Sequence, residues 1–164
     1  MFLSQFNLEE KIAFLKLAHI VASIDGELES NEKIILEQYA QEMHLQDILK
    51  ELNESIEMPS RGASLGSALE IMMGNTPNKT STTDILDNVA DLVSVFKSNT
   101  AHRILLLEIM VIFYANNEYH PEQQEIITFI LEAYDLSPHL ITVYTEWAKS
   151  ILSLYKQGEA LINL

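Results

Sequence analysis

An internal repeat constrains the fold of this chain more than any other feature of its sequence. Shifting the sequence by 91 residues aligns 14–45 with 105–136 without a gap. Each half has the pattern of a very apolar helix, a short acidic turn and an amphipathic helix. We therefore expect two similar helical hairpins, at about 12–45 and 103–136, related by a pseudo-two-fold axis. The apolar positions that coincide are Ile35, Leu36, Tyr39, Ala40, Met43 and Leu45 with Ile126, Ile127, Ile130, Leu131, Tyr134 and Leu136.

Apolar residues follow helical spacing through nearly the whole chain, and no segment alternates convincingly as a strand. One linker stands out at about 74–81, where Gly, Pro, Asn and Thr cluster. The sequence therefore predicts an all-α fold, with about seven or eight helices in a single domain over 1–164. The expected helices lie near 7–25, 30–44, 47–57, 64–73, 85–96, 101–115, 121–134 and 138–157.

The first helix of each half is apolar on almost every side, which is typical of a helix in the protein interior. Asn7 with Glu10 has the pattern of a capping box at the start of the first of them. The residues that we expect to be buried are Leu15, Ala18, Val21, Ala22, Leu106, Ile109, Val111 and Phe113.

The net charge of −14 narrows the range of partners. It argues against nucleic acid and anionic membrane surfaces, and it favours cations and basic partners. The longest apolar stretch, 104–115, is interrupted by Glu108 and is shorter than the roughly 20 residues of a membrane span. With no targeting segment and no cysteine in the sequence, we expect a cytoplasmic protein without direct membrane insertion.

Two segments of the repeat resemble the TerB-like family. The first is Leu17–Glu27, with the sequence LAHIVASIDGE, followed by Ser30, Asn31 and Glu32 at the start of an amphipathic helix. The second, 114–123, has the same pattern with substitutions. The family takes in tellurite-resistance TerB and the cytoplasmic domain of a membrane-bound DnaJ-type co-chaperone. The resemblance implies a helical, non-enzymatic acidic module in a tellurite-resistance-type stress response.

The resemblance also implies a metal site, because clustered acidic residues of this family have been proposed to bind a divalent cation. Hard cations of the Ca²⁺ or Mg²⁺ class prefer several carboxylate and carbonyl oxygens in one place. Asn116 and Asn117 depart from the family pattern, since they replace a second Asp-Gly and remove a charge. Carried over by position, the candidate ligands are Asp25, Glu27, Glu32, Glu118 and Glu122.

A structural explanation for the same residues stays open. Gly26 and Asn117 suit the left-handed conformation that ends a helix. Glu32 and Glu122 lie in the first turns of their helices, where a negative side chain interacts favourably with the helix dipole. The first turn is not an EF-hand, because Ser30 would occupy the sixth position of the loop, where glycine is required.

The alternative function is a small hydrolase or another enzyme that uses Ser64 or a carboxylate cluster. The segment 62–66, GASLG, matches the Gly-x-Ser-x-Gly nucleophile elbow. That elbow requires a preceding strand within an α/β sheet, which is not expected here, so Ser64 is more simply a helix N-cap.

Three aromatic residues are expected to have packing roles and not catalytic or metal-binding ones. His19, inside an apolar helix, is expected to be a hydrogen-bonded core residue. Tyr144 and Trp147 are expected to pack the last helix, although an exposed edge of that helix could bind a partner. We expect protein partners, and the sequence is compatible with a homodimer.

Overall fold

The computed structural model describes residues 2–24, 28–57, 82–115 and 121–163. Over these residues the chain forms seven α-helices and one turn of 3-10 helix, with no strand, which confirms the all-α prediction. The elements are η1 Leu3–Gln5, α1 Leu8–Ala22, α2 Ser30–Met43, α3 Gln46–Glu57, α5 Thr82–Val93, α6 Asn99–Phe113, α7 Pro121–Ala133 and α8 His139–Ile162. The expected helix at 64–73 and the linker at 74–81 lie outside the described residues.

Helix bounds follow the internal repeat closely. Helices α1 and α6 begin 91 residues apart and also end 91 residues apart, and α2 and α7 begin with the same offset. Residues His44 and Asp135, which the repeat aligns, both have positive φ, at 60° and 49°. In each case the next residue donates a backbone hydrogen bond to the carbonyl five residues earlier. Leu45 N–H donates to Ala40 O at 2.8 Å, and Leu136 N–H donates to Leu131 O at 2.9 Å. The same helix-ending motif therefore closes both hairpins.

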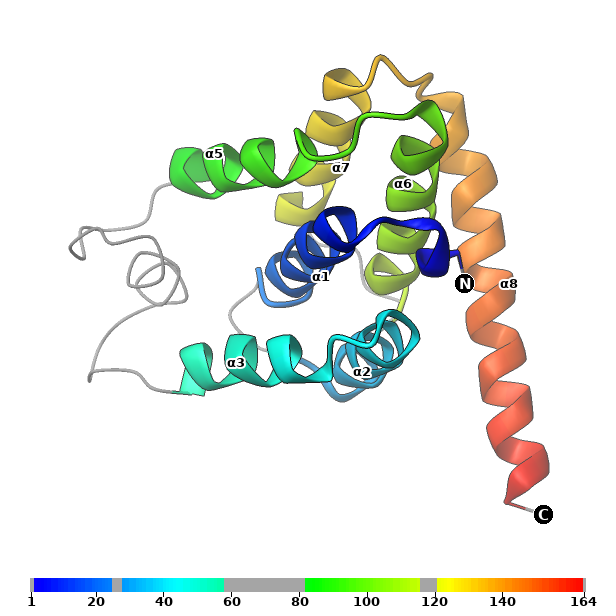
Figure 1. Cartoon of the computed structure of the whole chain (residues 1–164). Helices are drawn as coiled ribbons and strands as arrows, with labels where there is room; N and C mark the ends of the chain where they lie inside the picture. The colour runs from blue at the N-terminus through cyan, green and yellow to red at the C-terminus, as the bar shows by residue number, and fades with distance from the viewer. Residues whose placement is uncertain (1, 25–27, 58–81, 116–120, 164) are drawn as a thin grey trace.

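Helix α1 lies in the middle of the molecule and packs against α2, α3, α5 and α6 (Figure 1). Its N-terminus has the predicted capping box, in which Asn7 Oδ1 accepts the Glu10 N–H and Glu10 Oε2 accepts the Asn7 N–H, both at 3.0 Å. Nine of its fifteen residues are buried, as its apolar sequence predicts. All eight residues that we expected to be buried are at most 1% exposed.

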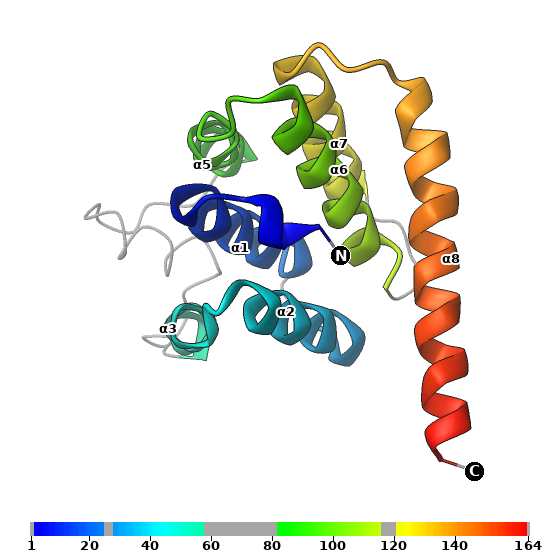
Figure 2. The same ribbon diagram turned by 45° about the vertical axis from the view of Figure 1, so that its right-hand side comes forward.

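Helix α8 is longer than predicted, since it continues through Gly158 to Ile162 instead of ending near 157. Glycine inside a helix costs only about 0.5–1 kcal/mol relative to alanine, so a single glycine does not have to end one. The N-terminal part of α8 packs along α6, and its C-terminal end extends past the other helices in both views (Figure 2).

Candidate functional site

The helix ends that flank the two acidic turns lie next to each other. Asn31, at the start of α2, donates its Nδ2–H to the carbonyl of Ala115, just after α6, at 3.4 Å. Gln123, at the start of α7, donates its Nε2–H to the carbonyl of Val21, near the end of α1, at 3.5 Å. Each hydrogen bond joins one hairpin to the other. The fold therefore brings together the ends of α1 and α6, where the acidic turns begin, and the starts of α2 and α7, where they end.

Among the five candidate metal ligands, only Glu32 has a described side chain. It is 3% exposed, and its Oε2 accepts the backbone N–H of Glu29 at 3.0 Å, which caps the start of α2. Glu122 lies in the first turn of α7, but its side chain is not described. Asp25, Glu27 and Glu118 lie outside the described residues. Over the described part of the chain, no group of three or more His, Asp and Glu residues is arranged to hold a metal ion.

Sequence reasoning missed the contribution of Gln123, although the repeat contains the signal for it. The 91-residue shift aligns Gln123 with Glu32, and both side chains are 3% exposed. A buried polar residue at the same position of both halves indicates a paired structural role, because buried polar groups need hydrogen-bond partners. One of the two is an amide donor and the other a carboxylate acceptor, so the two halves are not chemically equivalent.

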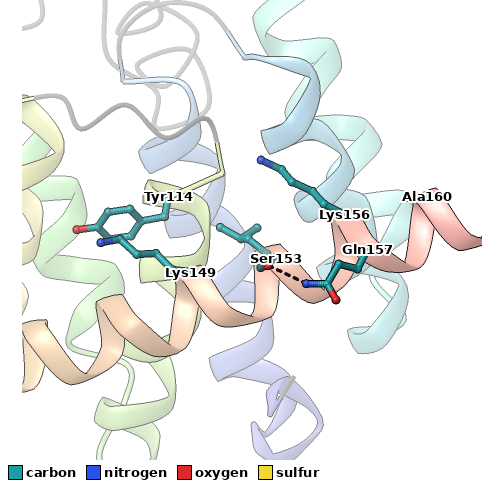
Figure 3. Close-up of a pocket in the computed structure, with 7 residues that line it drawn as sticks. Tyr114, Lys149, Ser153, Lys156, Gln157 and Ala160 are labelled. Atoms are coloured by element: carbon teal, nitrogen blue, oxygen red, sulfur yellow. Dashed lines mark hydrogen bonds between the residues drawn. The ribbon is translucent and has the colours of Figure 1, made fainter.

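An open groove of about 430 Å³ lies between α8 and the end of α6 (Figure 3). The Lys149 ammonium lies 5.3 Å from the centre of the Tyr114 ring, within range of a cation–π interaction, and 3.7 Å from Glu146. Lys156 lines the same groove. Two of the ten Lys and Arg residues thus lie near the C-terminal end of α6.

A second groove, of about 530 Å³, lies beside α7 and includes Glu125 and Glu132. Neither of the two grooves is lined by a histidine or by a serine–histidine–acid set. The segment 62–66, with Ser64, lies outside the described residues.

Glu108 is a buried carboxylate that the sequence marked only as an interruption of an apolar stretch. It is 0% exposed, and its Oε1 accepts the Phe2 N–H at 2.7 Å. The hydroxyl of Tyr39 donates to the Glu108 main-chain carbonyl at 2.7 Å. The carboxylate Oε2 has no hydrogen-bond partner among the described residues. Burial raises the pKa of Glu108, and the hydrogen bond from Phe2 opposes this effect.

His19 has the environment that its apolar helix predicts. It is 6% exposed, and its Nε2 lies 3.0 Å from Asn53 Oδ1 on α3. Burial lowers the pKa of His19, which the hydrogen bond with Asn53 partly offsets. The expectation of a hydrogen-bonded core histidine is therefore confirmed, and His19 links α1 to α3.

Comparisons with protein-family models, with curated proteins and with solved structures found no significant match. The TerB-like resemblance thus stays a prediction that is based on the residues quoted above. Among the described residues, no helix is both long and apolar enough to cross a bilayer.

Proposed function

We propose that the chain is a non-enzymatic, acidic TerB-like module of a tellurite-resistance-type stress response, which binds a divalent cation at its acidic turns. The observation that carries the proposal is the pair of hydrogen bonds between the hairpins, from Asn31 to Ala115 and from Gln123 to Val21. These bonds join the helix ends that flank the turns, so one ligand could engage both turns. The stress-response role is supported by the sequence resemblance alone.

Charge supports a cation as the ligand. The chain carries −14, and the proposed ligands Asp25, Glu27, Glu32, Glu118 and Glu122 belong to the turns or to the helix starts after them. Carboxylates gathered without a counter-charge repel one another, and a divalent cation relieves that repulsion. The helix dipoles add little net field, because the negative ends of α1 and α6 lie beside the positive ends of α2 and α7. Oxygen ligands of this kind favour Ca²⁺ or Mg²⁺.

The module would act through a protein partner, because it carries no catalytic group in this proposal. The negative field of the chain favours a partner with a basic surface. Cation binding would then regulate the partner by changing the charge and rigidity of the end where the turns lie.

Thermal unfolding with and without added Ca²⁺, Mg²⁺, Mn²⁺ or Zn²⁺ tests the proposal. A ligand that binds only the native state at 100 times its Kd stabilises it by about 2.7 kcal/mol, so the unfolding temperature should rise. Asp25→Asn should make the cation-free protein slightly more stable by removing one repelling charge. The same substitution should weaken binding; a tenfold loss of affinity would remove about 1.4 kcal/mol of cation stabilisation.

Asp47→Asn is the matched control, since it removes the same charge from an exposed position in the first turn of α3. That position lies beyond the opposite end of α2, so the response to cation should stay as in the wild type. The purely structural explanation of the turns instead predicts that Asp25→Asn is nearly neutral. Unfolding temperatures that do not change up to millimolar cation, for every ion tested, would contradict cation binding.

A further inference from the structure

The charged residues of α8 are confined to one side of the helix. Written as a heptad with Tyr144 at position a, the helix carries Glu146, Lys149, Lys156 and Glu159 only at positions b, c and f. The other four positions are uncharged throughout. This distribution is typical of a helix that pairs with another helix along its a and d positions. The uncharged residues are Tyr144, Ile151 and Gly158 at a, Trp147, Leu154 and Leu161 at d, Ala148, Tyr155 and Ile162 at e, and Val143, Ser150 and Gln157 at g.

The body of the protein covers only part of this uncharged face. Ala148 is fully buried, in the part of α8 that packs on α6, but Leu154 is 61% and Leu161 is 72% exposed. A Cβ atom added at Gly158 would meet nothing within 4 Å. The C-terminal part of α8 extends past the other helices in both ribbon views (Figures 1 and 2). Beyond Trp147, which packs partly on the body, the d positions Leu154 and Leu161 therefore form an uncovered apolar stripe.

We propose that a second copy of this chain covers the stripe, with the two α8 helices antiparallel and a two-fold axis beside Leu154. This arrangement is self-complementary, as a two-fold interface requires. Leu154 meets its own equivalent, and Leu161 lies opposite Trp147 of the other copy. Ile151 lies opposite Gln157, next to Gly158, where the missing side chain leaves room.

If two copies associate, charge favours this face over the charged faces of the molecule, and it favours the antiparallel direction. Two chains of −14 repel each other, and a stripe without carboxylates lets them approach with the fewest like charges in contact. A basic partner, in contrast, would be drawn to a surface that carries carboxylates. In the antiparallel pair the acidic bodies lie toward opposite ends, because each body packs on the N-terminal part of its own α8. A parallel pair would bring both bodies to the same end.

Light scattering after size-exclusion chromatography measures the mass of the full chain directly. The wild type is expected at twice 18.6 kDa, at protein concentrations up to about 100 µM, well above a micromolar Kd. Leu154→Glu with Leu161→Glu should reduce the mass to 18.6 kDa. The matched control, Ser153→Glu with Ala160→Glu, adds the same charges with the same spacing at exposed c positions, and should stay dimeric. Circular dichroism confirms that each variant keeps its helices.

Disulfide trapping tests the position of the two-fold axis, because the chain contains no cysteine of its own. A disulfide requires Cα atoms within about 7 Å of each other, which two Leu154 positions across the axis satisfy. Leu154→Cys should therefore crosslink to a covalent dimer under mild oxidation, and Ser153→Cys should not. A monomeric wild type, a dimer that survives the Leu154 and Leu161 substitutions, or equal crosslinking of both cysteine variants would overturn the proposal.

Discussion

Phe14→Ala should lower the free energy of unfolding by about 3–5 kcal/mol, as expected when a large buried ring is removed and a cavity remains. Phe14 is 0% exposed in the middle of α1. Its ring centre lies 5.7 Å from that of Phe6 and 5.3 Å from that of Tyr39, in an edge-on arrangement with the latter. The substitution therefore removes contacts to the N-terminal segment and to α2 together. Urea unfolding followed by circular dichroism measures the loss.

Leu8→Ala is the control for this prediction. Leu8 is the first residue of the same helix and is 66% exposed, so its truncation should change stability by no more than about 0.5 kcal/mol. Equal losses for the two variants would mean that α1 is not the centre of the core.

Raising the pH should destabilise the native protein through Glu108. Burial raises the pKa of Glu108 above its ordinary value of 4.5, so the native state holds this proton more tightly than the unfolded chain. Its contribution to stability is complete below pH 4.5 and is lost as the pH rises through the raised pKa. Each unit by which folding raises the pKa corresponds to about 1.4 kcal/mol.

Glu108→Gln isolates this effect, because the amide keeps the size of the side chain and cannot ionise. The variant should gain stability over the wild type as the pH rises above 4.5, and the difference should become constant above the raised pKa. Urea unfolding at a series of pH values measures this difference, with exposed Glu37→Gln on α2 as the matched charge control. A difference between Glu108→Gln and the wild type that does not change with pH would contradict the buried ionisation.

The internal repeat and the helices were predictable because they depend on local spacing. Helical hydrogen bonds join residues a few positions apart, so an apolar stripe and a capping pair such as Asn7 and Glu10 define a helix without knowledge of its neighbours. The repeat then aligned His44 with Asp135, and both have the left-handed conformation that ends a helix. The limit of local reasoning appears at Gly158, where a helix-weakening residue lies within α8 and does not end it.

The candidate site was predictable only in part. The sequence alone located the acidic turns and their flanking residues, including Glu32, whose described role is to cap α2. It did not indicate that Asn31 would contact Ala115, or that Gln123 would contact Val21, because each pair is separated by more than 80 residues. Such contacts depend on how the two hairpins pack, which no local pattern specifies.

The sequence by itself determined the helices, their apolar faces and the repeat, since these follow from hydrogen bonding and side-chain spacing within one segment. Only the tertiary structure decided which polar groups are buried and which apolar faces stay open. Glu108 lies in the interior because α6 is enclosed by α1, α7 and α8, and it meets Phe2 from the start of the chain. Leu154 and Leu161 stay exposed because, in the described part of the chain, no other helix covers their side of α8. The physical reason is that burial is a property of the whole assembly of helices, so the same apolar stripe can end in a core or in solvent.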